Sequence, residues 1–405
     1  KYNKGTVKAD EVGVKAKDDY TLEVTLENPT AYFLALMAFP TYAPVREDIV
    51  SKDPTGWARK AETYISNGPF KMKEWKPKDT ITFVKNDQYW NKDSIKLERI
   101  DYKMIEQESS ALAAFKAGQL DYIKQPPAQE IPQLIKDGVA EILPNLGTYF
   151  YCVNISDNAE KVNAEVAKAL KDPKVRKALT LAIDRKQIVE NVTKGGQIAA
   201  TSYVPVGILK ADGTEFKDKD YFKAEGDVQE AKKLLAEAGY PDGKGFPKIE
   251  LLYNTNEGHQ NIAQAVQDMW RKNLGINIEL KNQEWKVFQK SRTDKNYEIA
   301  RHGWLGDYVD PMTFLDMWVT GGGNNDAGYS NAEYDKLIKA AMAESDAAKR
   351  MELLRKAEDI LMEDMPIIPI YYYTEVVCLN KNVKELVQTP LGFYYFDKAY
   401  IETAK

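Results

Sequence analysis

The chain has 405 residues, enough for two or three domains, and its 43% of apolar residues can bury sizeable cores. Its 61 acidic and 56 basic residues are finely interspersed and leave a net charge of −5, which argues against a nucleic-acid partner because such proteins need a basic face. No apolar run approaches the ~20 residues of a membrane-spanning helix.

The first stretch of the chain predicts a mixture of strands and helices. An apolar alternation over residues 20–26 predicts a half-buried strand, and a turn at Ser66 to Phe70 precedes the next pair of strands. The remaining elements expected here are a helix at 32–37, strands at 70–76, 81–84 and 99–105, a helix at 109–117, and short strands at 120–123 and 141–143.

Beyond residue 146 the pattern becomes an alternation of strands and helices. The expected elements are a long strand over 146–155, helices at 173–183, 185–192 and 228–238, strand 248–253, helix 259–273, strand 276–282, helix 285–292, strand 297–301, helices 334–342 and 349–362, and a second long strand over 367–379. This spacing indicates an α/β domain. The two long β-prone runs predict crossings between two lobes, with a cleft and a hinge between them.

The stretch from Arg301 to Pro311 carries the strongest local signal. Asp307 follows a predicted strand, with Trp304 and Tyr308 close by, so its carboxylate is placed to meet a positively charged ligand group in a partly dry site. A strand-end cap is the alternative role for this acid. The pattern favours recognition of a ligand over chemistry.

Catalytic and metal-binding motifs are missing from the sequence. It contains no nucleophile elbow, phosphate-binding loop or zinc-protease motif, and Gly321 to Gly323 is interpreted as a loop. His259 and His302, the only histidines, lack metal-ligand spacing. Cys152 and Cys378 lie in apolar runs and are predicted to be buried thiols, not a disulfide. We therefore expect neither an enzyme nor a cofactor.

One alternative from another functional class remains, a carboxylate-based hydrolase. Asp307 with a second acid such as Asp310 would form its catalytic pair. Their short spacing instead favours a binding acid followed by a helix cap.

Several motifs resemble those of the extracellular oligopeptide-binding receptors of ABC peptide importers, solute-binding protein family 5. They run the length of the chain: Gly13-Val14-Lys15-Ala16, Asn67-Gly68-Pro69-Phe70, Asn86 with Tyr89-Trp90, Val175-Arg176-Lys177-Ala178-Leu179, Ala231 to Tyr240, Leu251 to Thr255, Asn282 to Trp285, and Pro369 to Tyr373. The oligopeptide branch of the family is the most similar.

The resemblance implies a fold and a set of partners. The expected fold is α/β and two-lobed, of the periplasmic-binding-protein-like type II, with residues 1–147 and 375–405 in a first lobe and 148–374 in the second. The expected partners are an oligopeptide and an ABC transporter permease, with a monomeric receptor located outside the cytoplasmic membrane, periplasmic or held at the cell surface as a lipoprotein. The same scaffold could instead bind a dipeptide, an oligosaccharide, haem or a nickel chelate.

Residues of the resemblance also suggest a binding site. Asp307 matches the acid that pairs with the α-ammonium of a bound peptide, and Gly303, Trp304 and Leu305 match a strand whose backbone pairs with the peptide. The other matches are Arg292, Arg301 and His259, offering positive charge to the carboxyl ends of peptides, Trp285 in a side-chain pocket, and Tyr149 and Tyr151 near the cleft. Ordinary surface or core roles are the alternative for each of these.

Two departures from the family pattern stand out. Leu305 and Gly147 occupy positions where the family can carry a pair of cysteines. The family also has a long segment before Gly13, which supplies part of the first lobe and its own peptide-facing strand. Because the chain begins at Lys1 without a signal peptide, we expect a fragment or one part of a split protein, with an incomplete first lobe and weak peptide binding by this chain alone.

Overall fold

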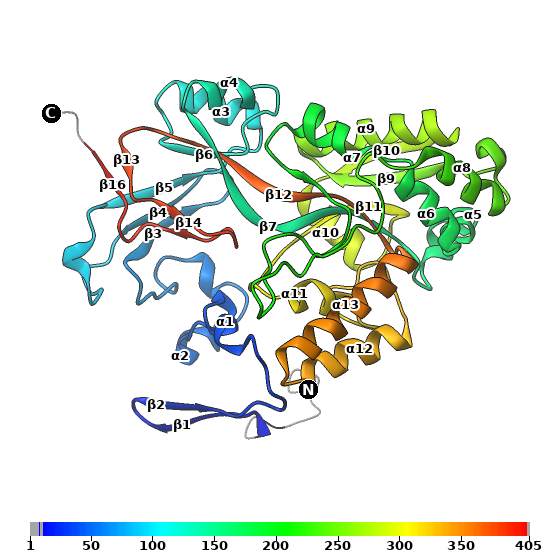
Figure 1. Cartoon of the computed structure of the whole chain (residues 1–405). Helices are drawn as coiled ribbons and strands as arrows, with labels where there is room; N and C mark the ends of the chain where they lie inside the picture. Colours follow the sequence, from blue (N-terminus) through cyan, green and yellow to red (C-terminus); the bar gives the residue numbers. More distant parts are fainter. Residues whose placement is uncertain (1–7, 9–10, 403–405) are drawn as a thin grey trace.

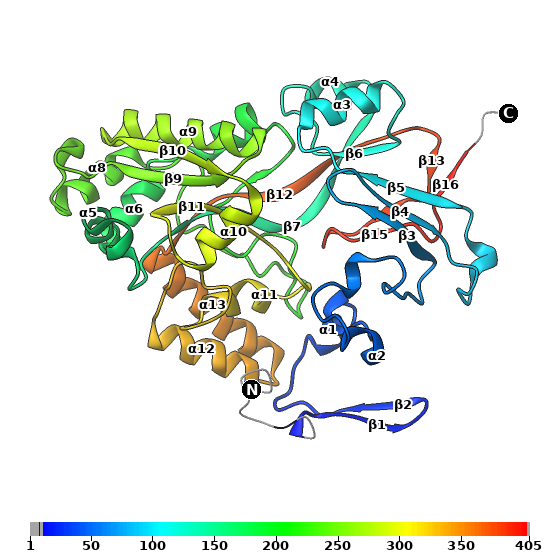
Figure 2. The same cartoon turned by 180° about the vertical axis from the view of Figure 1, so that it is seen from behind.

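Two lobes lie side by side and are joined by two long strands (Figures 1 and 2). The computed structural model describes residue 8 and residues 11–402. The connecting strands are β7 (Ala140–Val153) and β12 (Ile367–Leu379), which pair antiparallel from Cys378 opposite Ala140 to Ile367 opposite Cys152. Since both strands extend into both lobes, the lobes are connected by one antiparallel ladder, which has register shifts between Pro369 and Tyr371 and between Tyr372 and Thr374.

The sheet of the larger lobe is built around this pair. Its strand order is β10-β9-β11-β7-β12-β6, with β8 also paired to β12. The other strands are β6 (Tyr122–Lys124), β8 (Ile198–Ala199), β9 (Ile249–Asn254), β10 (Ile278–Gln283) and β11 (Ile299–Leu305). Strands β10, β9 and β11 are parallel, whereas β11 runs antiparallel to β7.

Helices cover both faces of this sheet and create two cores. On β7, Tyr149 and Val153 face one core, whereas Phe150 and Cys152 face the other, as strand alternation requires. The helices are α5 (Ala159–Lys171), α6 (Pro173–Leu181), α7 (Arg185–Gln187) with a π-helix (Ile188–Thr193), α8 (Val228–Glu237), α9 (Glu257–Leu274), α10 (Trp285–Thr293), α11 (Met312–Leu315), α12 (Ala332–Ala343) and α13 (Ala347–Asp364).

The smaller lobe has a three-stranded meander and a separate small core. The meander is β3 (Phe70–Lys76), β4 (Thr80–Lys85) and β5 (Arg99–Lys103), and the core lies under α3 (Glu108–Lys116) and α4 (Ile131–Lys136). Two-stranded pairs come from the end of the chain: β13 (Val383–Lys384) with β16 (Tyr400–Ile401), and β14 (Val387–Gln388) with β15 (Tyr394–Tyr395).

Single 3-10 turns occur along the chain at Pro40–Tyr42, Trp57–Arg59, Lys92–Ser94, Pro241–Gly243 and Asp316–Trp318.

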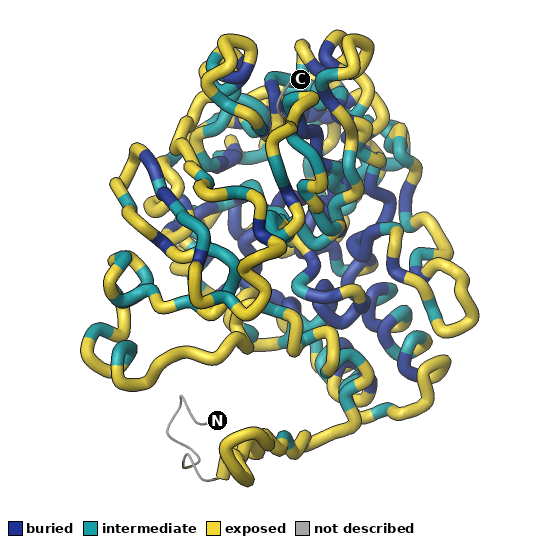
Figure 3. The backbone as a smooth tube through the Cα atoms, turned by 90° about the vertical axis from the view of Figure 1, so that its left-hand side faces the viewer, coloured by how far each residue is buried: buried dark blue, intermediate teal, exposed yellow. Residues whose placement is uncertain are grey.

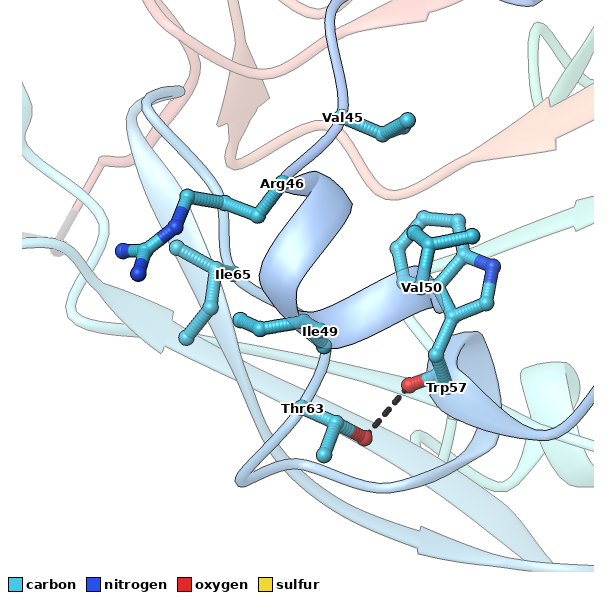
Figure 4. Close-up of a pocket in the computed structure, with 7 residues that line it drawn as sticks. All are labelled: Val45, Arg46, Ile49, Val50, Trp57, Thr63 and Ile65. Carbon is cyan, nitrogen blue, oxygen red and sulfur yellow. Dashed lines mark hydrogen bonds between the residues drawn. The ribbon is translucent and has the colours of Figure 1, made fainter. Parts of the chain in front are cut away.

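A hairpin near the beginning of the described chain lies apart from both cores. The hairpin of β1 (Val14–Asp18) and β2 (Thr21–Val24) is exposed along almost its whole length (Figure 3). Short helices α1 (Phe33–Met37) and α2 (Glu47–Val50) follow. A hollow of about 20 Å³ beside α2 has Thr63 donating to the Trp57 carbonyl at 2.6 Å (Figure 4), and it has room for roughly one water molecule.

Most predicted elements are present, but several predictions differ from the structure. The strand expected at 20–26 with one face buried is β2, which is exposed apart from the partly buried Val24, and strand β1 before it was not predicted. Residues 141–143 and 146–155 form one strand, because the register shift beside Thr374 accommodates Pro144, which has no N–H to donate. The helix expected at 185–192 is one α turn followed by the π-helix, and the strand expected at 297–301 continues to Leu305. Helices α2, α4 and α5 and the short strands β8 and β13 to β16 were not predicted.

Gly147 and Leu305 face each other across β7 and β11. A Cβ at Gly147 would lie 2.5 Å from the Trp304 carbonyl oxygen and 2.6 Å from Leu305 Cδ2, so the leucine side chain fills the space that the glycine leaves. Cys152 and Cys378 are both free and buried, as predicted.

Replacing Gly147 with alanine should therefore destabilise the fold. We expect Gly147→Ala to lower the free energy of unfolding by about 1–3 kcal/mol, because a methyl group must displace strand backbone. Urea unfolding measures this change. Gly323→Ala is the matched control, since a Cβ there meets nothing within 4 Å; equal stability of both variants would contradict the packing argument.

Candidate functional site

A cavity of about 390 Å³ lies between the two lobes. Its walls come from α3, β6 and the loop after β6 on one side, and from α9, β11 and β12 on the other. Figure 1 shows α3 and α4 in one lobe and α9 in the other, with β12 passing between the lobes below them. Four of the predicted site residues line it together: His259, Arg301, Gly303 and Leu305.

Arg301 is a cation without a counter-ion. Its guanidinium lies 5.0 Å from the Tyr149 ring, and Nη2 donates to Tyr373 Oη at 3.0 Å, while Nε has no partner. No carboxylate of the described chain pairs with it. Burial opposes the charge, but the hydroxyls of Tyr373 and Tyr149 outweigh burial and hold the pKa of Arg301 above its ordinary value.

His259 offers the cavity a hydrogen bond, which differs from the positive charge expected of it. It lies in the first turn of α9, where its backbone N–H donates to the capping side chain of Asn256 at 2.9 Å. Its Nδ1 is 3.4 Å from Tyr149 Oη. Burial and then the nearby Arg301 charge hold the pKa of His259 well below its ordinary value, so the ring is neutral at physiological pH.

Strand β11 presents an open backbone edge to this region. The Gly306 N–H donates to the Leu146 carbonyl at 2.8 Å. The backbone N–H and C=O groups of the even-numbered residues of β11 therefore point toward β7, and those of the odd-numbered residues point away from it. On that other side, β9 pairs only with Ile299 and Ala300. The edge from Arg301 to Leu305 has no strand partner in the described chain.

Gly303 is required in this strand by its neighbours. A Cβ there would overlap Tyr373 Oη, the group that holds Arg301. The backbone N–H of Gly303 donates to His302 Nδ1 at 2.8 Å, so an incoming strand has to compete for this group. His302 itself is buried, and its ring stacks on Phe150 at 4.7 Å.

Asp307 lies in the turn after β11, outside the cavity lining. Its backbone N–H donates to Thr313 Oγ1 at 3.1 Å, and its partly buried carboxylate has no ion-pair partner in the described chain. Burial raises the pKa of Asp307. The turn thus carries an acid that is costly to leave ionised without a cation.

The neighbouring acids have different environments. Asp310 is bonded by both oxygens to Arg350, each at 2.8 Å, and also accepts from the Met312 N–H at 2.9 Å as a helix cap. Asp316 has no such cation. Burial, followed by the charges of Asp307 and Asp310, raises the pKa of Asp316 to about 7.

A segment of the smaller lobe reaches this acidic turn. The ring of Tyr32, just before α1, stacks on Tyr308 with centroids 4.7 Å apart. The guanidinium carbon of Arg350 lies 5.1 Å from the centroid of the same Tyr32 ring. The turn that carries Asp307 is therefore positioned from both lobes.

The structure places the other predicted residues outside the cavity. Arg292 pairs with Asp326 at 3.4 Å, and burial lowers its pKa. Trp285 is half exposed in the first turn of α10, where it stacks on Phe288. Trp304 is on the opposite face of β11 from Arg301 and packs against the other core. Tyr149 and Tyr151 are fully buried on the same side of the sheet as Arg301.

Sequence reasoning missed the residues that the smaller lobe and the start of α9 contribute. Glu108 and Lys124 line the cavity from α3 and β6, with Asn256 and Glu375 opposite or beside them. Glu375 had a signal, since it is an acid inside the apolar run of β12. Glu108 is an ordinary first-turn acid of a helix, and nothing local marks it out.

The described residues contain neither a cluster of metal-binding side chains nor a helix that could cross a membrane. Within residues 8 and 11–402, no three His, Cys, Asp or Glu side chains gather as a metal site would require. Over the same residues, no helix has the length and apolar character needed to cross a bilayer.

Comparison with known proteins gives consistent relatives. Residues 1–326 match the family model of bacterial extracellular solute-binding proteins, family 5 middle region. The oligopeptide-binding protein OppA of Bacillus subtilis (strain 168) is 44% identical over 99% of this chain and 72% of its own length. The dipeptide-binding protein DppE of the same organism is 37% identical over 97% of this chain and 70% of its own length.

Solved structures agree with the sequence relatives. The Borrelia burgdorferi oligopeptide-binding protein OppAIV superposes with a TM-score of 0.89 at 33% identity, covering 99% of this chain and 77% of that one. Haemophilus influenzae OppA in complex with the peptide RPPGFSPFR gives a TM-score of 0.85 at 32% identity and the same coverage. The two-lobed fold with two β crossovers is thus that of the type II binding proteins.

The raised pKa of Asp316 predicts a pH-dependent stability. Because its folded pKa of about 7 exceeds the ordinary 3.8, the folded chain holds this proton more tightly than the unfolded chain. The resulting stabilisation is present below about pH 4 and is lost as the pH rises to 7. Asp316→Asn, which cannot ionise, should therefore gain stability over the wild type at pH 8 but not at pH 4.

Urea unfolding at pH 4, 6 and 8 measures this difference. The exposed Asp157→Asn is the control and should track the wild type throughout. A pH-independent effect of Asp316→Asn would contradict the assignment.

Proposed function

Because the chain belongs to the bacterial extracellular solute-binding proteins of family 5, we propose that it captures an extended oligopeptide between its lobes and delivers it to an ABC transporter permease. The names of its relatives support an oligopeptide as the solute, above all OppA of Bacillus subtilis at 44% identity. The observation that carries the proposal is the open edge of strand β11. The unpaired cation of Arg301 lies at one end of this edge, and the unpaired acid Asp307 lies beyond the other end.

The two charges match the two ends of a peptide. Arg301 would receive the terminal carboxylate, whereas Asp307 would receive the α-ammonium. At ~3.3 Å per residue, these positions are at most ~20 Å apart, a span that an extended peptide of about six residues covers. Between them, Gly303 and Leu305 would pair with the peptide backbone, which gives affinity without reading side chains.

The remaining predicted residues have supporting roles in this proposal. His259 would donate or accept a hydrogen bond in the cavity. Tyr149 and Tyr151 would support Arg301 from behind. Arg292, Trp285 and Trp304 would stay outside the peptide-contacting surface in the present arrangement, with Arg292 committed to Asp326.

Closure of the lobes would use the two long strands. We assign residues 1–147 and 375–405 to the first lobe and 148–374 to the second, so that β7 and β12 form the hinge. Water filling the unoccupied parts of side-chain pockets would let one receptor accept many sequences.

The receptor would bind its ligand without converting it, as a monomer outside the cytoplasmic membrane, anchored as a lipoprotein where no periplasm exists. Asp310 is committed to Arg350 and to a helix cap, which leaves Asp307 without that partner for hydrolysis. Mass spectrometry of ligand released from the purified protein tests the solute class. Recovered peptides support the proposal, whereas a sugar, haem or a metal chelate would replace it.

The acid that holds the ammonium is tested by substitution. Asp307→Asn should weaken binding of peptides with a free amino terminus by about 10- to 100-fold, the effect of losing one charge-assisted contact. N-acetylated versions of the same peptides should lose much less. Isothermal titration calorimetry measures both, and an equal loss for the two forms would rule out the ammonium assignment.

The carboxylate end has a parallel test. Arg301→Met should weaken binding of peptides with a free carboxyl terminus by about tenfold or more, while C-terminal amides should change little. Arg292→Met, which breaks an ion pair outside the cavity, is the control and should not discriminate between the two forms. If Arg292→Met, and not Arg301→Met, weakened only the peptides with a free carboxyl terminus, the carboxylate would have to be assigned to Arg292.

A further inference from the structure

His302 reaches the open edge of β11 from the face of the strand that is turned away from the cavity. Arg301 and Gly303 line the cavity, whereas His302 does not. Its ring is buried and stacks on Phe150, with centroids 4.7 Å apart and planes inclined by 10°. Because a packed core leaves such a ring little freedom to turn, the positions of its two nitrogens are fixed.

One ring nitrogen of His302 faces a carboxylate. Its Nε2 lies 3.2 Å from Asp326 Oδ2, and the same oxygen lies 3.4 Å from Arg292 Nε. A carboxylate only accepts hydrogen bonds, so it favours the form of the ring that carries its proton on Nε2. Burial lowers the pKa of His302 to about 4, although the bond to Asp326 opposes this shift. At neutral pH the ring therefore holds this one proton.

The other ring nitrogen then has a free lone pair, and the Gly303 amide uses it. The backbone N–H of Gly303 donates to His302 Nδ1 at 2.8 Å. The Gly303 carbonyl oxygen is 3.0 Å from the same nitrogen, but it could accept only from a ring that carries a proton on Nδ1. With the proton on Nε2, the ring occupies the N–H of Gly303 and leaves its carbonyl open.

This hydrogen bond engages the amide that an incoming strand needs. The N–H of Gly303 points away from β7, toward the edge where the described chain supplies no strand partner. An unpaired N–H in such a place is costly when it is shielded from water, and it invites pairing with the wrong chain. A side chain that satisfies the N–H until a ligand carbonyl arrives avoids both problems.

We propose that His302 masks the N–H of Gly303 until a peptide binds, and then yields it to a backbone carbonyl of that peptide. Asp326 is a positioning residue that keeps the proton on Nε2 and so keeps Nδ1 available to the amide. The inference rests on the proposed peptide-binding function, and it adds a residue that sets affinity from outside the cavity. Peptide affinity is lowered because one hydrogen bond has to be exchanged on binding.

Two variants of similar size separate the mask from the packing of the ring. Asparagine places an amide oxygen near the position of Nδ1 and can accept from Gly303, whereas leucine cannot. Both His302→Asn and His302→Leu lose the bond to Asp326 and the stack on Phe150. Calorimetry with one peptide should show about 2- to 10-fold tighter binding by His302→Leu than by His302→Asn, because one competing hydrogen bond is absent.

The ring nitrogens of the wild type give a second readout that does not depend on any variant of His302. His259 is the only other histidine of the chain, so His259→Gln assigns the signals of protein labelled with ¹⁵N-histidine. Before peptide is added, His302 should carry a proton on Nε2 and none on Nδ1. Saturation with peptide should shift the Nδ1 signal, because this nitrogen loses the Gly303 N–H.

Three results would overturn the inference. They are binding by His302→Asn that equals or exceeds binding by His302→Leu, a proton on Nδ1 before peptide is added, and an unchanged Nδ1 signal at peptide saturation. Absence of peptide binding by the wild type and by both variants would instead reject the peptide-binding function. The spectrum of the wild type before addition of peptide would still report the mask, so the two failures are distinguishable.

Discussion

The antiparallel pairing of β7 with β12 is the constraint on which the rest of the molecule depends. These strands carry Asn145, Tyr373 and Glu375 into the cavity, and β7 sets the register of β11 and so the position of Arg301. A slip of one residue would turn every one of these side chains to the opposite face. The cleft is therefore specified by strand register, and the helices hold that register by packing against both faces.

Hydrophobic pattern was sufficient to predict the long strands and most helices. The run from Ile367 to Leu379 was expected as one strand and forms one, and Asp310 is the helix cap that its spacing suggested. Helix α5 was not predicted, and Asn163 interrupts it with non-helical backbone, φ −160° and ψ 106°. Glu108 and Asn256 belong together only through tertiary contact, so no local pattern could join them.

The same limit applies to charge. A sequence shows which residues can ionise, but not which of them are neutralised by a partner. Asp307, Asp310 and Asp316 are similar in sequence, yet only Asp310 has an arginine on both oxygens. His259 and Arg301 were both expected to offer positive charge. The neighbouring tyrosines keep the pKa of Arg301 above its ordinary value, whereas burial lowers the pKa of His259 and keeps the imidazole neutral.

The contact of Leu305 with Gly147 has a consequence for the surroundings in which the cleft can work. At this position, next to the turn that carries Asp307, β7 and β11 are in van der Waals contact through Gly147 and Leu305. The two cysteines of the chain are free thiols that are buried elsewhere. No covalent link in the fold is open to reduction. Its geometry should therefore be indifferent to the thiol–disulfide balance of its surroundings, whereas a cystine at this position would respond to it.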